Sequence, residues 1–231
     1  MSMLNKLKIK VCGITDINQA LALEAMGVDY IGFIFYSPSK RYVLGNLQLA
    51  DLKAFNPSNA KKVGVFVNET IEVVVNTVIA AGLDMVQLHG DEDEAYFIEL
   101  NEKLKGQIAA TTIVNEAAMA VKLIKVFRVG DKMPLIDTYM EVADYFLFDT
   151  DSKLYGGTGA HFNWELLKGN PINKSFFLSG GIGPNDIGGI EVMKQTKAGN
   201  TMIALDVNSQ FEITPGVKNL EKIKTFINAF V

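Results

Sequence analysis

The sequence is poor in three residue types that often carry chemistry: among 231 residues it has one cysteine, two histidines and two arginines. A single cysteine, Cys12, cannot form an internal disulfide, which favours a reducing compartment, and we expect the cytoplasm. Neither His89 nor His161 has another His or Cys at ligand spacing, so we expect no metal site.

Long apolar runs and blocks of like charge are also missing. No stretch of about 18 apolar residues is available to span a membrane. The N-terminal segment "MSMLNKLKIKVCGIT" alternates Lys with apolar residues and lacks the continuous apolar region of a secretory signal. With 22 basic and 26 acidic side chains the net charge is -4. We therefore expect neither nucleic acid nor a membrane surface as a partner.

What is present is a repeated pattern of a short apolar run followed by a helix. Runs rich in Val, Ile and Phe begin near residues 8, 29, 62, 84, 107, 143, 175 and 201, at spacings of 21 to 36 residues. The phrase "MGVDYIGF" at 26–33 recurs as "AGLDMVQL" at 81–88. Eight such units predict an α/β protein, a single (β/α)8 TIM barrel over residues 1–231, with an open doubly wound sheet as the alternative.

Two local assignments go with this prediction. The first helix should start after Asp16 as N-cap and end at Gly27. Its buried face would consist of Ile17, Leu21, Ala25 and Val28. The fifth strand is assigned to "QIAATTIV" at 107–114, although residues 116–126 obscure its connection to the sixth.

In such barrels the reacting groups lie at the carboxyl ends of the strands. Cys12 ends the first predicted strand. A lone cysteine there is usually a small buried side chain; the alternative is a thiolate acting as base or nucleophile, which needs help because an ordinary thiol has a pKa of about 8.5.

Asp149 ends the apolar run "ADYFLF" of the sixth strand. A carboxylate beside so apolar a strand is paired, caps a backbone group, or is held for catalysis, and the sequence leaves these readings open. As an acid near neutral pH it would need a raised pKa, which burial can supply. His89, in "VQLHG", could equally be a supporting hydrogen-bond donor or a neutral core histidine.

Arg41 lies in "SPSKRYV", after the second strand, in a chain that otherwise uses lysine twenty times. It could be a solvated cation, but an arginine fork also suits a carboxylate or phosphate in a way that lysine does not. Arg128 is better explained as an ion-pair residue at a strand end.

A phosphate site is predicted from two loops. "SGGIGPND", with Gly180 and Gly181, follows the seventh strand, and "DVNSQFE", with Asn208 and Ser209, follows the eighth. That is where backbone N–H groups often hold a phosphate in these barrels. A further segment, "GGTG" at 156–159, would be either a mobile cover or a plain flexible loop.

The motifs together resemble one family. In chain order they are "KVCGIT", "GFIFYSPSKRYV", "VGVFVN", "VQLHGDE", "FLFDT" followed by "GGTG", "FLSGGIGPNDI" and "LDVNSQFEITPGVKN". Across nearly the whole chain they are similar to phosphoribosylanthranilate isomerase of tryptophan biosynthesis.

The resemblance implies an Amadori rearrangement of N-(5-phosphoribosyl)anthranilate to the aminoketose, without metal or cofactor, in a monomer or homodimer. It implies that Asp149 is the general acid and Cys12 the general base. Arg41 would receive the anthranilate carboxylate. His89 and Asp206 would have supporting roles.

The chain departs from the family pattern at four positions, Asn163, Asn208, Gln210 and Phe211. None of them removes a proposed catalytic group. Two other functions remain as alternatives. A related aminosugar-phosphate isomerase of histidine biosynthesis would have aspartate in place of Cys12, and a barrel without catalytic activity would lack the acid or the base.

Overall fold

The fold is a closed barrel of parallel strands in the order β1 to β8. We describe it from a computed structural model, for residues 7–111, 120–150, 163–170 and 172–230. The strands are β1 Lys8–Cys12, β2 Tyr30–Ile34, β3 Lys61–Phe66, β4 Met85–Leu88, β5 Lys122–Val129, β6 Tyr145–Thr150, β7 Phe176–Leu178 and β8 Met202–Val207. The predicted (β/α)8 barrel is confirmed, and the open sheet is excluded.

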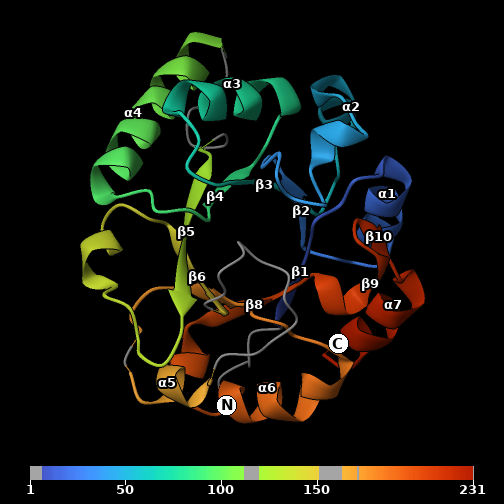
Figure 1. The fold of residues 1–231 in the computed structure, drawn as a ribbon, viewed down its shortest axis with the longest axis vertical. Helices are drawn as coiled ribbons and strands as arrows, with labels where there is room; N and C mark the ends of the chain where they lie inside the picture. Colours follow the sequence, from blue (N-terminus) through green and yellow to red (C-terminus); the bar gives the residue numbers. More distant parts are fainter. Residues whose placement is uncertain (1–6, 112–119, 151–162, 171, 231) are drawn as a thin grey trace.

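Helices surround the barrel, as Figure 1 shows. They are α1 Ile17–Ala25, α2 Leu49–Ala54, α3 Ile71–Ala81, α4 Glu94–Thr111, α5 Glu165–Lys168, α6 Ile187–Lys194 and α7 Leu220–Asn228. A short antiparallel hairpin, β9 Glu212–Thr214 and β10 Val217–Lys218, stands between β8 and α7. No helix in the described part of the chain has the length and apolar character needed to cross a membrane.

Helix α1 begins and ends where the sequence predicts but buries another face. The Asp16 carboxylate accepts a hydrogen bond from the Asn18 N–H at 2.9 Å, and Gly27 takes a left-handed φ of 83° after the last turn. The buried side chains of the helix are Ala20 and Leu23, whereas Leu21 is 50% exposed. Of the predicted face, Val28 is buried and Ile17 packs partly buried against the core, but Leu21 and Ala25 are exposed. The sequence "INQALALEA" has apolar residues on more than one side, so spacing alone could not choose between the faces.

The assignment of the fifth strand was also wrong. Residues 107–111 form the last turns of α4, and β5 is Lys122–Val129. "QIAATTIV" is apolar enough to look like a buried strand, and such a run cannot be told from a helix by periodicity. In β5 the lysines Lys122 and Lys125 break the apolar run, although Lys125 is buried and its Nζ donates to the Glu92 carbonyl at 2.9 Å.

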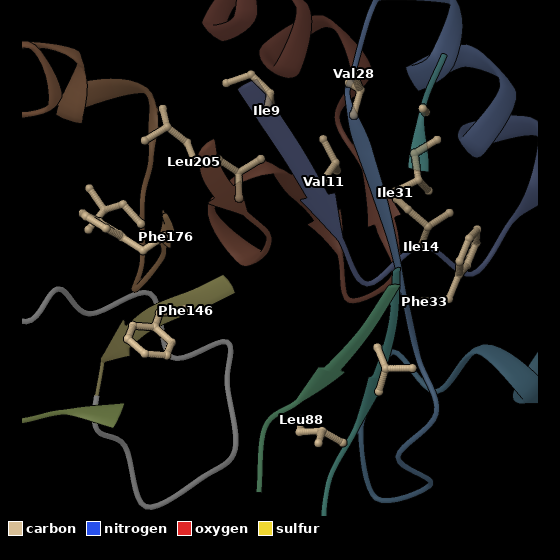
Figure 2. Packing of buried hydrophobic residues seen from close by; sticks show 14 of the residues in the cluster. Ile9, Val11, Ile14, Val28, Ile31, Phe33, Leu88, Phe146, Phe176 and Leu205 are labelled. Carbon is tan, nitrogen blue, oxygen red and sulfur yellow. The ribbon is translucent and has the colours of Figure 1, made fainter. Parts of the chain in front are cut away.

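The core has two layers, because each strand of a parallel barrel is buried on both faces. The outer layer packs strands against helices, and Figure 2 shows Ile9 and Val11 of β1 with Ile31 and Phe33 of β2 in that layer. The inner layer fills the barrel with Tyr30, Val63, Met85, Ile124, Val126, Leu147, Phe177 and Ala204. Since side chains alternate along a strand, Lys10 and Cys12 lie on the opposite face from Ile9 and Val11.

Phe211, one of the departures from the family pattern, fixes the hairpin to the barrel. It ends a 3-10 helix, Ser209–Phe211, and is fully buried. Its ring packs edge-to-face against Phe226 of α7, with ring centroids 4.9 Å apart. The substitution therefore serves packing behind the site, not contact within it.

Candidate active site

Most of the predicted site residues share one pocket at the carboxyl ends of the strands. From the predicted set the pocket is lined by Cys12, Arg41, His89, Asp149, Gly181, Asp206, Asn208 and Ser209. Gly180 is the predicted residue outside this lining, and it adjoins Gly181 in the turn after β7. Residues far apart in the chain thus meet at the point that the barrel rule indicates.

Cys12 is the last residue of β1 and is only 4% exposed. The neighbouring strand makes room for its sulfur: a Cβ added to Gly32 would lie 2.8 Å from the Cys12 Sγ. Gly13, the next residue, has a left-handed φ of 79° and turns the chain away. The thiol therefore stands in a close-fitting, largely dry position.

A buried ion pair lies two residues below the thiol. The Lys10 Nζ donates to the Asp206 Oδ1 at 2.7 Å, and the two side chains are 0% and 7% exposed. Although burial lowers the pKa of Lys10, Asp206 and Cys12 outweigh that effect and raise it above its ordinary value. Lys10 is therefore a permanent cation beside the thiol.

Burial nevertheless raises the pKa of the Cys12 thiol above its ordinary value. The Lys10 and Lys218 charges oppose the rise, but the Asp206 carboxylate cancels part of their effect. Cys12 is consequently a thiol, not a thiolate, in the free protein at neutral pH.

Asp149 comes from the end of β6 and belongs to the same pocket. Burial, reinforced by the Asp206 charge, raises its pKa to about 6. The Thr150 N–H donates to its Oδ1 at 2.9 Å, and the His89 Nε2 lies 3.4 Å from its Oδ2. A carboxyl with such a pKa can exchange a proton near neutral pH, which an ordinary aspartate cannot do effectively.

His89 is neutral in this setting because burial, followed by the Lys10 charge, lowers its pKa to about 4. Its Nδ1 lies 3.3 Å from the Gln87 Nε2. If the Gln87 amide donates there, the ring proton is on Nε2 and faces Asp149; this tautomer is inferred from the contact. Gln87 was not predicted as a site residue, although a polar residue two positions before His89 in a buried strand was a usable signal.

Arg41 lines the pocket, and one side of its guanidinium is already engaged. Its Nε and Nη2 donate to the two oxygens of Glu212 at 2.8 and 2.7 Å. Glu212 also accepts from the fully buried Lys218, whose Nζ lies 2.7 Å from its Oε1. Neither Glu212 nor Lys218 was predicted as a site residue. Arg128, by contrast, pairs with Asp91 near the end of β5, as expected.

The turn after β7, predicted as part of a phosphate site, has a backbone conformation that favours glycine. Gly180 and Gly181 take φ angles of 90° and 73°, which a side chain would strain. The Asn208 side chain accepts from the Lys218 Nζ at 2.6 Å. Gln210 packs against the turn, since a Cβ on Gly183 would lie 3.4 Å from the Gln210 Cβ.

The remaining departure from the family pattern is Asn163, whose Oδ1 accepts from the Glu165 N–H at 3.0 Å at the start of α5. An aspartate would make the same bond, so the change leaves the helix start intact. The segment "GGTG" and His161 lie outside the described residues. Within the described ranges no cluster of three or more His, Cys, Asp or Glu side chains could hold a metal ion.

The fold and the pocket together define a class of protein, a (β/α)8 barrel with titratable side chains gathered in a pocket at the carboxyl ends of its strands. Comparison with known proteins then gives the family. The chain belongs to the N-(5'-phosphoribosyl)anthranilate (PRA) isomerase family, whose model matches residues 9–229.

Individual relatives agree with this placement. The chain is 38% identical to the N-(5'-phosphoribosyl)anthranilate isomerase of Aquifex aeolicus, over 95% of this chain and 96% of the relative. It is 36% identical to the enzyme of the same name from Parabacteroides distasonis, over 95% and 91%. Among solved structures, the phosphoribosyl anthranilate isomerase of Thermotoga maritima is 31% identical, with a TM-score of 0.71 over 96% of this chain and 98% of that one. The resemblance seen in the sequence is confirmed.

Proposed function

We propose that Asp149 and Cys12 carry out, as general acid and general base, the isomerisation of N-(5'-phosphoribosyl)anthranilate that defines this family of tryptophan biosynthesis. The observation that carries the proposal is the pairing, in one pocket, of a carboxyl with a pKa of about 6 and a buried thiol. Acid and base come from β6 and β1, so they can address two parts of one substrate.

The acid step opens the sugar. Protonated Asp149 donates its proton to the furanose ring oxygen, the bond from that oxygen to C1 breaks, and the nitrogen lone pair forms an iminium at C1. With a pKa of about 6, roughly a tenth of the carboxyl is protonated at pH 7. An unperturbed aspartate would be protonated in fewer than about one molecule in a thousand.

The base step follows from the iminium. Cys12, as thiolate, removes the proton from C2, and the electrons of that bond move to the iminium nitrogen to give an enolamine. Tautomerisation of the enolamine gives the aminoketose product. The order is chemically required, because the C2 proton becomes acidic only once C1 can accept electrons.

Substrate contacts are assigned to both ends of the pocket. Arg41 receives the anthranilate carboxylate, and the turns at Gly180–Gly181 and Asn208–Ser209 hold the phosphate through backbone N–H groups. His89 and Asp206 support the reacting groups. A related structure supports the assignment of a carboxylate contact and a phosphate contact. It is a phosphoribosyl anthranilate isomerase in complex with reduced 1-(o-carboxyphenylamino)-1-deoxyribulose 5-phosphate, 29% identical with a TM-score of 0.68 over 96% of this chain and 97% of that one.

We also propose that residues 1–231 act as one domain in the cytoplasm, where the free thiol of Cys12 would remain reduced. For the oligomeric state we retain monomer or homodimer. One Thermotoga maritima structure, 30% identical with a TM-score of 0.66 over 96% of this chain and 97% of that one, is of monomers generated from a dimeric phosphoribosylanthranilate isomerase. Light scattering of the purified chain would decide between the two.

The test of the function is direct. Purified protein is mixed with freshly made N-(5'-phosphoribosyl)anthranilate, and the loss of substrate fluorescence is followed. We expect turnover by the parent chain and a loss of at least about a hundredfold for Asp149→Asn, which cannot donate a carboxylic proton. Asp131→Asn, an exposed change after β5, is the matched control and should leave the rate unchanged. Absence of turnover by the parent would refute the function.

A further inference from the structure

We infer that Glu212 positions the Arg41 guanidinium for the substrate carboxylate, which makes the β9–β10 hairpin a working part of the carboxylate subsite. The inference rests on the proposed function, in which Arg41 receives that carboxylate. Glu212 is argued to act through Arg41, so it is a positioning residue and not a catalytic one.

The contact between the two side chains fixes the orientation of the fork. Arg41 Nε donates to Glu212 Oε1 at 2.8 Å and Arg41 Nη2 donates to Oε2 at 2.7 Å, and the side chains are 12% and 5% exposed. Such a bidentate pair leaves the guanidinium no freedom to rotate in its plane. Glu212 uses the edge that contains Nε, so the edge formed by the two Nη groups is the one offered to a ligand carboxylate.

Lys218 and the hairpin turn hold Glu212 in place. The Glu212 Oε1 accepts from the Lys218 Nζ at 2.7 Å and from the Gly216 N–H at 3.1 Å. Burial would raise the pKa of Glu212, but hydrogen bonding from Arg41 and the charge of Lys218 outweigh it and lower the pKa, so the carboxylate is ionised. Lys218 also donates to the Asn208 Oδ1 at 2.6 Å, which ties the hairpin to the loop after β8.

The charge of this cluster suits an anion. Arg41 and Lys218 share one carboxylate, Glu212, so the guanidinium in the pocket wall has no carboxylate of its own; burial lowers the pKa of Lys218, which the Glu212 charge opposes. A substrate carboxylate brings the missing negative charge. Without Glu212 the two buried cations would face each other without compensation, and Arg41 would be displaced toward solvent.

The turn after Cys12 is shaped to admit Arg41. A Cβ on Gly13 would lie 2.7 Å from the Arg41 Cδ and 2.9 Å from the Asn208 Oδ1. Gly13 therefore leaves space for the arginine stem directly beside the residue that bears the thiol. Gly13 thus places the residue that receives the carboxylate next to the proposed base.

The competing explanation is that Glu212 and Lys218 only stabilise the hairpin. A substrate without the carboxylate separates the two roles: N-(5-phosphoribosyl)aniline keeps the sugar, phosphate and nitrogen but offers Arg41 nothing to bind. The measured quantity is the ratio of kcat/KM for the anthranilate substrate to kcat/KM for the aniline substrate. A merely structural role would lower both values and leave the ratio unchanged.

We expect Glu212→Gln to lower this ratio by about tenfold or more, mainly through a raised KM for the anthranilate substrate. Arg41→Ala should lower it at least as far. Because Glu212 acts through Arg41, the double variant should have the ratio of Arg41→Ala alone. Glu191→Gln, which removes the carboxylate of a partly exposed ion pair with Lys194 on α6, is the matched control and should leave the ratio intact.

Two results would overturn the inference: an unchanged ratio in Glu212→Gln, or a ratio in the double variant that falls by the product of the two single losses. In either case, activity of the parent chain would still uphold the proposed function. A parent chain that turns over neither substrate would overturn both. If Glu212→Gln is too unstable to purify, Glu212→Asp keeps the charge balance but is one methylene too short for the bidentate contact, and the same fall in ratio is expected.

Discussion

The pH dependence of kcat/KM should have an unusual assignment, because the acid and the base lose their protons in the reverse of the order that catalysis needs. Asp149 has a pKa of about 6, while the pKa of Cys12 lies above its ordinary value of about 8.5. Between these values the main form has Asp149 ionised and Cys12 protonated. The reactive form, with the proton on Asp149 and not on Cys12, carries the same number of protons.

The fraction of the enzyme that is in the reactive form follows from the two pKa values. Because the reactive and the main form have equal proton counts, the reactive fraction is independent of pH between the two pKa values. This fraction is small, because the pKa of Asp149 is about 6 while burial raises the pKa of Cys12 above its ordinary value. We expect kcat/KM to rise tenfold per pH unit up to about pH 6, to stay level across neutrality, and to fall only above the pKa of Cys12.

The rise of kcat/KM up to pH 6 then reports the ionisation of Asp149, although Asp149 acts as the acid. Below pH 6 both Asp149 and Cys12 are protonated, so no thiolate is present to act as the base. The assay is initial-rate fluorescence from pH 5 to 10. The phosphate of the substrate also titrates near pH 6. The residual activity of Asp149→Asn separates the two sources, since a limb that persists in this variant comes from the substrate. A limb centred near pH 4, or a rate that is highest below pH 6, would refute the reasoning.

Two further predictions concern β1. Cys12→Ala should abolish turnover while calorimetry finds the reduced aminoketose phosphate bound with near-normal affinity; undiminished turnover would remove the thiol from the mechanism. Lys10→Met should lower the free energy of unfolding by about 3–5 kcal/mol, because it leaves the Asp206 carboxylate buried without its cation, and denaturant titration measures this. Adding Asp206→Leu should recover part of the loss, and no recovery would contradict this cause.

Much of the barrel could be predicted because buried parallel strands have a strong local signature. Strands starting near residues 8, 29, 62 and 84 were placed within one residue of the observed starts. The fifth strand failed because β5 contains two lysines: Lys122 is exposed, and Lys125 is buried only because it has a partner elsewhere in the fold. A local pattern does not report such partners, so "QIAATTIV" at 107–114 was the stronger local candidate.

The same limit applies to the site. Residues at strand ends could be chosen from position, and the pocket brings Cys12, His89 and Asp149 together. Glu212 could not be chosen in this way, because its contact with Arg41 joins residues 171 positions apart in the chain. The sequence singled out Arg41 after β2 as a candidate for binding an anion, but the residue that orients it was visible only in three dimensions.

The arrangement of charges explains how a thiol of raised pKa can serve as the base. Lys10 and Lys218 are the nearest cations, yet each is already paired with a carboxylate, so together they offset only part of the cost of burying a thiolate. The missing positive charge comes from the substrate. When Asp149 opens the sugar, an iminium forms next to the C2 proton that Cys12 must remove, and a nearby cation lowers the pKa of a thiol. Proton donation by the acid therefore stabilises the Cys12 thiolate, which the reactive form already carries, at the step in which Cys12 acts as the base.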